Sequence, residues 1–480
     1  MARYPEQLEE RAALLAQHWE AAGETLEAAR WHARAAAWTG YNDPTQALPH
    51  WRKVRELADG LPESAETVAL GLQARISLLN YGWRLGISHE EAQALFTEAE
   101  RIASETGDVR SWAILLSSYA AVRGLGDGDV REFAKLGRQA IALAEESGDR
   151  ELYVGIGMSY APFLVGEYRE TVTMCDRAIE LADGDPTLGA GIIFGCPYAL
   201  CHQVKGWVLA ELGEFEEARR LIEQGRKLAR EQGDNEVVGW SHYFSTWLAY
   251  WQGEPEAALT HAQLSLETAE QIGSPFSRAH EWMILGLAQR MRGDWQRAID
   301  ALDRSLEITR ESHTAVEVEA WRLALLGESY LGLGDPERAR SLVQEGLEMA
   351  RARGNVLYET HASLALARVL LGSAGTAARA EIEAALARVL ELSLETGARA
   401  IKPMVHVELA ELARQSGEEE ERQRELREAH RLFTEIGASG HAERLAGELA
   451  TPVVPCERVG DSEPDAPVGA KAGARQGRPS

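Results

Sequence analysis

The chain shows its architecture in one segment, Gly206-Trp207-Val208-Leu209-Ala210-Glu211-Leu212-Gly213-Glu214-Phe215-Glu216-Glu217-Ala218. A small residue, Gly206, precedes the turn glycine Gly213 by seven positions, and Ala218 follows that glycine by five. Such spacing is typical of a helical hairpin, in which small residues let two antiparallel helices approach closely on either side of a tight turn.

The same spacing recurs further along the chain. The alanine returns at Ala258, Ala298 and Ala339, in steps of 40, 40 and 41 residues, and turn glycines precede each one. A fixed period in this range is typical of a solenoid of stacked units. Strong helix formers dominate the composition, and proline is scarce before residue 450. We therefore predict an all-α, right-handed superhelical solenoid of antiparallel helix pairs, about 40 residues per repeat.

Three regions are expected. Residues 1–64 form an N-terminal helical cap or junction unit, with helices near 8–19, 26–38 and 45–57. Residues 65–450 form the solenoid. Residues 451–480, rich in Pro, Gly and charge and without an aromatic residue, are expected to be disordered. The helix pairs of the solenoid are predicted near 66–84 with 89–105, 109–123 with 129–147, 150–165 with 168–182, 199–212 with 214–232, 236–252 with 254–272, 276–292 with 294–311, 316–333 with 335–353, 356–371 with 376–396, and 401–416 with 418–436. A last helix is expected near 441–449.

One irregularity interrupts the period. Between the equivalent positions Thr171 and Ala218 the step is 47 residues rather than 40. The extra residues fall in the Gly-rich, apolar segment 183–203, which is a poor helix. We expect a longer loop here that folds back on the body.

Charge and cysteine usage limit the function classes. The formal net charge of −25 repels phosphate backbones, so we expect no nucleic-acid partner. No apolar run is long enough to cross a membrane, and residues 1–10 do not resemble a secretion signal. The four cysteines, Cys175, Cys196, Cys201 and Cys456, form no metal-ligand pattern and are interpreted as thiols in a reducing cytoplasm.

The repeat pattern, seen as Gly327, Tyr330, Gly334 and Ala339, resembles the tetratricopeptide repeat in a lengthened form. The opening segment 10–24 and the closing segment 432–445 resemble the two ends of the helical tail in bacterial regulators that carry a class III adenylate cyclase and a signal-transduction ATPase. The resemblance covers roughly residues 6 to 450 and implies a signalling role. It does not extend to the family's catalytic residues, because no P-loop motif occurs in this sequence. The chain is therefore expected to be a stand-alone tail or one split from its catalytic half.

No catalytic constellation emerges from the sequence. A His-Glu-x-x-His motif and a Gly-x-Ser-x-Gly elbow are both absent, and the histidines never take the spacing of a metal-ligand set. Acidic pairs such as Glu216-Glu217 are interpreted as solvated helix faces. We therefore predict a protein that is not an enzyme, with no cofactor, no metal and no catalytic residues.

An aromatic stripe gives the candidate site. At about 100° per residue, the aromatic side chains of the predicted helix 236–252 gather on a face different from that of the small residues Thr246 and Ala249. Trp207 takes the place of Trp247 one repeat earlier, and Trp321 takes that of Trp240 two repeats later. Arg290 projects in nearly the same direction as Tyr250. The predicted groove for a ring-bearing ligand or a peptide consists of Trp207, Trp240, Tyr243, Trp247, Tyr250, Trp251, Arg290 and Trp321.

Two interpretations of this stripe stay open. The rings either stack on a ligand or pack between repeats, and packing is the more frequent role of aromatic stripes at helical spacing. Arg290 either meets an anionic group or pairs with a nearby glutamate.

The leading functional hypothesis is a cytoplasmic scaffold of a bacterial signalling system. It binds a protein or peptide partner, such as a cyclase or ATPase module, and its groove takes a small ring-bearing ligand. The alternatives are the detached C-terminal part of an adenylate or guanylate cyclase–ATPase, and the small-ligand sensor arm of an ATP-dependent transcriptional regulator.

Overall fold

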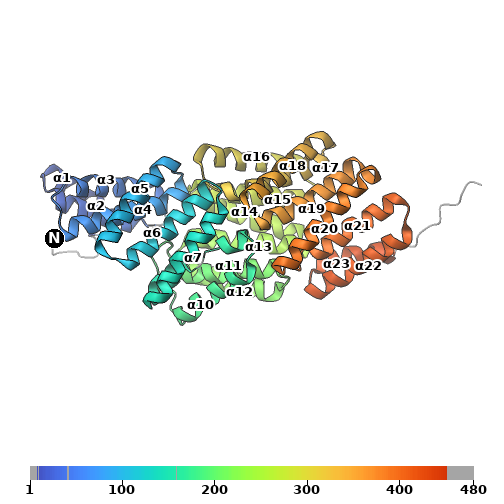
Figure 1. Ribbon diagram of the computed structural model, residues 1–480, viewed down its shortest axis with the longest axis horizontal. Coiled ribbons are helices and arrows are strands. Elements are labelled where there is room, and N and C mark those ends of the chain that lie inside the picture. Colours follow the sequence, from blue (N-terminus) through green and yellow to red (C-terminus); the bar gives the residue numbers. More distant parts are fainter. Residues whose placement is uncertain (1–7, 9, 41–42, 158, 451–480) are drawn as a thin grey trace, which may run out of the picture.

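The chain is helical throughout its described part. A computed structural model describes residues 8, 10–40, 43–157 and 159–450, and among these residues there are helices and turns but no strand (Figure 1). The fold is an all-α superhelical repeat array, which confirms the predicted class. The tail predicted to be disordered, 451–480, lies outside the described residues, as does Cys456.

Each repeat pairs a first helix that is buried on most sides with a second helix that keeps an exposed face. The first helices are α4 (Ala65–Leu85), α6 (Val109–Ala121), α8 (Arg150–Ile156), α11 (Pro197–Glu211), α13 (Asn235–Gln252), α15 (Pro275–Met291), α17 (Glu319–Gly332), α19 (Val356–Ser373) and α21 (Lys402–Ser416). The second helices are α5 (His89–Thr106), α7 (Val130–Ser147), α10 (Tyr168–Ala182), α12 (Phe215–Gln232), α14 (Pro255–Ile272), α16 (Trp295–Ser312), α18 (Pro336–Arg353), α20 (Arg379–Thr396) and α22 (Glu419–Ile436).

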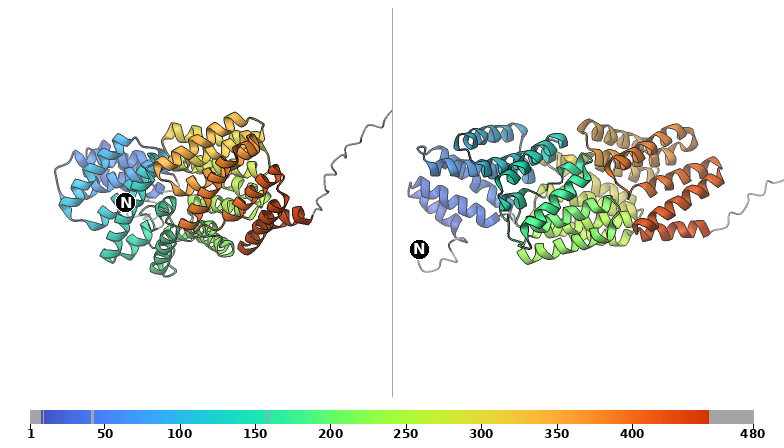
Figure 2. Two further views of the ribbon diagram at one scale, coloured as in Figure 1. Left: turned by 45° about the vertical axis from the view of Figure 1, so that its right-hand side comes forward. Right: turned by 60° about the horizontal axis from the view of Figure 1, so that its bottom comes forward.

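The body is elongated. The helices α1 (Ala12–Ala21), α2 (Thr25–Thr39) and α3 (Pro44–Asp59) lie at one end, and α21, α22 and α23 (Ser439–Ala450) lie at the other (Figure 1). Figure 2 shows the same arrangement from two further sides. α1 and α2 share a small apolar core of their own, whereas α3 packs into the main core. The division into a cap, 1–64, and a solenoid, 65–450, stays a prediction.

A Gly-Asp turn, Gly233-Asp234, links the second helix of one repeat to the first helix of the next. Gly233 ends α12 in the left-handed region at φ 71°, and the carboxylate of Asp234 caps α13 by accepting a hydrogen bond from the backbone N–H of Val237. Asp234 also accepts from the N–H of Cys196 at 2.8 Å, so the same side chain holds the preceding loop.

The small residues inside the hairpins allow close helix approach. A Cβ atom added at Gly327 would lie 2.3 Å from Cγ2 of Val343 and 2.8 Å from the carbonyl oxygen of Ala339. The nearest atom to such a Cβ would be Cγ1 of Ile222 at 2.8 Å for Gly206, and Cγ of Leu302 at 2.6 Å for Gly286. The sequence prediction that these glycines form the contact face is therefore confirmed.

The superhelix winds tightly enough for distant repeats to touch. The N–H of Ala400 donates to the carbonyl of Glu211 at 3.1 Å, and Nε of Arg399 donates to the carbonyl of Leu212 at 2.9 Å. Likewise, the hydroxyl of Ser274 donates to the carbonyl of Arg84, 190 positions away in the sequence. The interior faces of the first helices therefore pack against one another across the superhelix.

One predicted helix is wrong. The range 150–165 is not continuous: α8 ends at Ile156, and a separate turn of helix, α9 (Ala161–Leu164), follows. The Gly-rich loop presses on α8 here, since a Cβ on Gly189 would lie 2.6 Å from the backbone nitrogen of Gly155. The loop folds back on the body as predicted, but it ends sooner, because α11 already begins at Pro197.

Candidate functional site

The structure divides the aromatic stripe into two groups. Trp207, Trp240 and Tyr243 line a cavity, whereas the remaining members lie away from it. Trp247 and Trp251 have no exposed surface, and Tyr250 and Trp321 are also buried.

The second group forms an interior stack. The rings of Trp247 and Trp321 lie 4.3 Å apart at an interplanar angle of 15°, and Tyr358 continues the stack on the far side of Trp321. Trp251 donates from its indole N–H to the buried carboxylate of Glu211 at 3.1 Å. These rings join repeats, which is the packing role that the sequence left open.

Arg290 lies near Tyr250, with the guanidinium carbon 5.9 Å from the ring centroid. Its Nη1 atom is 3.4 Å from Oε1 of Glu328, and Arg368 contacts the same carboxylate oxygen at 3.0 Å. The two guanidinium groups hold the pKa of Glu328 below its ordinary value despite the burial that opposes them. Arg290 therefore belongs to a buried ion network.

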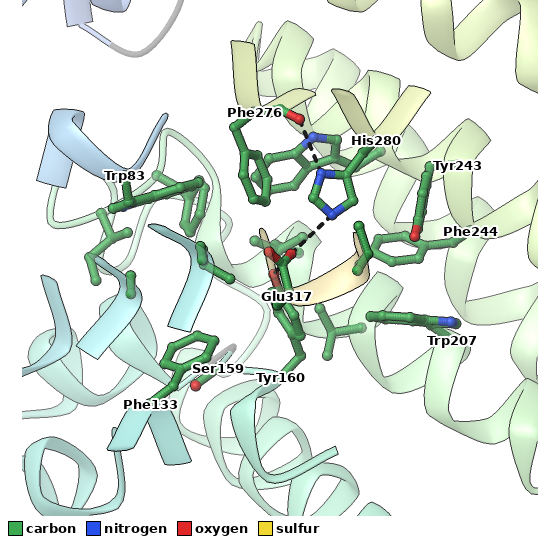
Figure 3. A pocket seen from close by; sticks show the side chains of 18 of the residues that line it. Trp83, Phe133, Ser159, Tyr160, Trp207, Tyr243, Phe244, Phe276, His280 and Glu317 are labelled. Carbon is green, nitrogen blue, oxygen red and sulfur yellow. Dashed lines mark hydrogen bonds and ion pairs between the residues drawn. The ribbon is translucent and has the colours of Figure 1, made fainter. Parts of the chain in front are cut away.

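The cavity has a volume of about 90 Å³ and an aromatic wall (Figure 3). Its walls come from repeats far apart in the sequence: α4, α6 and α7 on one side, and α11, α13, α15 and α19 on the other. Ten of the lining residues are Trp, Tyr or Phe: Trp83, Phe133, Tyr160, Phe194, Trp207, Trp240, Tyr243, Phe244, Phe276 and Tyr358. We call this cavity the aromatic pocket.

The Gly-rich loop completes the wall. Ile193 and Phe194 line the pocket, and Nη2 of Arg84 donates to the carbonyl of Ile193 at 3.0 Å. The same guanidinium lies over the ring of Phe194 and pairs with the buried carboxylate of Glu236 at 3.3 Å. The loop glycines Gly189 and Gly191, which have positive φ, let this apolar segment return to the interior, where Ile193 and Phe194 are buried.

Polar groups converge at one place in this wall. Oε1 of Glu317, which lies in the short 3-10 helix η4 (Val316–Val318), accepts from the hydroxyl of Tyr160 at 3.2 Å. Nε2 of His280 lies 3.1 Å from the same oxygen (Figure 3). Nδ1 of His280 donates to the carbonyl of Phe276 at 3.0 Å, so this nitrogen carries a proton. The contact with Glu317 then needs a second proton, placed on the imidazole or on the carboxyl group.

The second oxygen of Glu317, Oε2, is buried and has no hydrogen-bond partner among the described residues. Glu281 adds another carboxyl group to the wall, and burial raises its pKa to about 8. The lining contains no lysine or arginine. The buried guanidinium of Arg322, which feels the charge of Glu317, donates to Thr309 and Ala315 and is not part of the wall.

Sequence reasoning missed most of this pocket. Trp83, Phe276, His280 and Glu317 come from helices outside the stripe, and helical spacing within one repeat does not connect them. The available signal was the Gly-rich apolar loop, whose return to the body the sequence predicts.

Neither metal nor disulfide chemistry is indicated in the described part of the chain. No group of three His, Cys, Asp or Glu side chains there is arranged to hold a metal ion. Cys175, Cys196 and Cys201 are buried free thiols. None of the helices described combines the length and the apolar character that a membrane span requires.

Comparisons with known families support the repeat assignment. Residues 278–352 match the family model of the tetratricopeptide repeat. Residues 197–251 match that of anaphase-promoting complex subunit 5. No curated protein matches the chain.

Several solved helical proteins are similar in fold. A Rap protein complexed with competence and sporulation factor shares 12% identity at a TM-score of 0.48, covering 90% of this chain and 99% of its own. The Rap conjugation gene regulator of the plasmid pLS20, in complex with the Phr* peptide, shares 13% sequence identity at a TM-score of 0.47. The match covers 86% of this chain and 95% of that one. A signal-transduction ATPase from Pyrococcus horikoshii with a tetratricopeptide repeat sensor shares 12% sequence identity at a TM-score of 0.43. The match covers 83% of this chain and 57% of that one.

Proposed function

We propose that this protein is a non-catalytic, ligand-sensing scaffold whose aromatic pocket binds a small ring-bearing molecule. The observation that carries the proposal is the pocket itself, an interior space lined by ten aromatic side chains and a few convergent polar groups. Apolar pockets with a few placed polar groups are the usual form of small-molecule sites.

The position of the pocket suggests how binding would be sensed. Trp83 and Phe133 come from the N-terminal repeats, and Phe276 and Tyr358 come from the repeats that the superhelix brings opposite them. A ligand that contacts both sides favours the wound conformation over any in which the two sides separate. The outer helices would carry that change to a protein or peptide partner.

The finer assignment rests on the sequence resemblance alone. We propose a bacterial signalling system in the cytoplasm, with a cyclase or ATPase module as the partner. An upstream reading frame that encodes a P-loop and a cyclase motif next to this gene supports the cyclase–ATPase tail. A neighbourhood without such a frame contradicts it.

The pocket is tested by tryptophan fluorescence. Three indoles, those of Trp83, Trp207 and Trp240, line it, so titration of the full chain with ethylbenzene should change the tryptophan emission and raise the Tm. Val204→Phe should abolish both responses, because the larger ring fills the pocket that Val204 lines. Val109→Phe is the matched control, since Val109 is exposed at the start of α6. If no ring compound changes the emission or the Tm of the unaltered chain, the proposal is wrong.

A further inference from the structure

We infer that the ligand of the aromatic pocket is an amine, a ring-bearing organic cation whose N–H donates to Oε2 of Glu317. The inference rests on the proposed function and specifies the chemical class of its ligand. Three independent features of the wall support it.

The first feature is the charge of the lining. Apart from tyrosines, its ionisable groups are Glu317, Glu281 and His280, and neither lysine nor arginine is among them. An anionic ligand would be buried beside two carboxyl groups, with neither lysine nor arginine in the lining to pair with it, which is unfavourable in an apolar interior. A cationic ligand finds a carboxylate.

The second feature is the free oxygen. Oε1 of Glu317 is occupied by Tyr160 and His280, whereas Oε2 is buried with no partner among the described residues. A buried acceptor without a hydrogen bond costs free energy, which a donor on the ligand recovers. The side chain of Glu317 is almost fully inaccessible, so the acceptor is held in place before the ligand arrives.

The third feature is the ring wall next to this carboxylate. Tyr160 donates to Glu317, and its ring contacts that of Trp207 at 5.8 Å. Trp207 in turn contacts Tyr243 at 6.2 Å. The faces of aromatic rings carry negative electrostatic potential and attract organic ammonium groups. A charged nitrogen beside Glu317 would therefore meet both a carboxylate and ring faces.

The volume limits the size of the amine. About 90 Å³ exceeds several times the ~10–15 Å³ that one water requires. This space suits one ring with a short alkylamine chain rather than a peptide. A 2-phenylethylamine-sized molecule is therefore the appropriate probe.

Glu281 gives a second expected sign of amine binding, the release of a proton. Because its pKa lies near 8, this carboxyl group is largely protonated in the empty pocket at neutral pH. An ammonium group bound nearby favours the ionised carboxylate, so Glu281 should release a proton when the amine binds.

The experiment compares three probes of similar shape on the full chain by isothermal titration calorimetry: 2-phenylethylamine, 2-phenylethanol and phenylacetate. We expect the amine to bind about tenfold or more tightly than the alcohol, as for hydrogen bonds to charged groups, and phenylacetate to bind weakest. Glu317→Gln should reduce the amine-to-alcohol ratio to roughly threefold or less and leave the alcohol's affinity unchanged. The matched control is Glu267→Gln, which removes an exposed carboxylate on α14.

The outcomes separate the two proposals. If the alcohol binds as tightly as the amine, or the acid binds tightest, the amine inference is overturned while the pocket stands. If none of the three probes binds, the proposed function fails as well. The probe comparison uses the unaltered chain, so it decides the question even where Glu317→Gln does not fold.

Discussion

Trp247 and Trp321 stack face to face at a centroid distance of 4.3 Å, although they belong to α13 and α17, two repeats apart. Neither ring is reached from solvent: Trp247 is fully buried and Trp321 is 3% exposed. The contact therefore crosses the interior of the superhelix and ties together repeats that an extended solenoid would keep apart.

Removal of this ring should destabilise the whole molecule. We expect Trp247→Ala to lower the free energy of unfolding by about 3–5 kcal/mol, the usual range for a large buried ring. Trp38→Ala, which removes an indole that is 56% exposed, should cost little. Urea unfolding followed by far-UV circular dichroism measures both. Equal losses from the two variants would contradict the interior stack.

The pocket carboxyl Glu281 should make stability depend on pH. Its folded pKa, raised by burial to about 8, lies above the ordinary value of 4.5, so the folded state binds more protons between these values. Stability should therefore fall as pH rises through this window, by up to ~1.4 kcal/mol per pH unit from this group.

Glu281→Gln removes that titration. The Tm of the variant, relative to the unaltered chain, should rise steadily from pH 5 to pH 8 and level off above it. Thermal unfolding in matched buffers measures the difference. A difference that does not change with pH would show that Glu281 is ionised in the folded protein.

A histidine pair, His242 on α13 and His261 on α14, should make stability fall as pH falls, the opposite of the effect of Glu281. Nδ1 of His242 lies 3.0 Å from Nδ1 of His261, and burial together with the charge of Arg226 lowers their pKa values to about 3 and about 4. Unfolding restores the ordinary pKa of 6.5 and takes up protons. Stability from this pair is therefore complete above pH 6.5 and is lost as pH falls toward 4.

A double variant isolates the pair from the other histidines. With His242→Asn and His261→Gln, we expect a smaller loss of stability between pH 7 and pH 5 than in the unaltered chain. The urea midpoint at the two pH values is the measurement. An identical loss in both proteins would contradict the neutral pair.

The close helix approach at Gly327 has a direct test. Gly327→Ala should destabilise the protein by about 1–3 kcal/mol, because the new Cβ would overlap Val343 and the backbone of Ala339. The control is Gly60→Ala, where φ is −82° and the nearest atom would be 3.5 Å away. Chemical denaturation should show a change within about 0.5 kcal/mol for the control. A gain in stability at Gly327 would indicate that the hairpin can relax.

The sequence predicts the repeats because their signals are local. A glycine such as Gly327 and an alanine such as Ala339 lie twelve positions apart in one hairpin, and the structure places them in contact as expected. The aromatic pocket depends instead on the winding of the superhelix, which results from small rotations between successive repeats. Trp83 and Glu317 share a wall only because the chain winds back on itself, and neither has a spacing that links it to the other.

The stripe shows the same limit within one helix. Tyr243 and Trp247 lie one turn apart on α13, yet one lines the pocket and the other is enclosed by Trp321. Helical periodicity assigns both to one face. Which part of that face meets another repeat is decided by elements far away in the sequence.

The hydrogen bond from Ala400 to Glu211 has a mechanical consequence. In an open array of repeats, force applied to the two ends peels units off one after another, because each unit holds only its neighbours. Here hydrogen bonds also join two segments of the superhelix that lie almost two hundred positions apart in the sequence. When the molecule is stretched between its ends, these contacts should break first, in one large force peak. Individual repeats should unfold only after that.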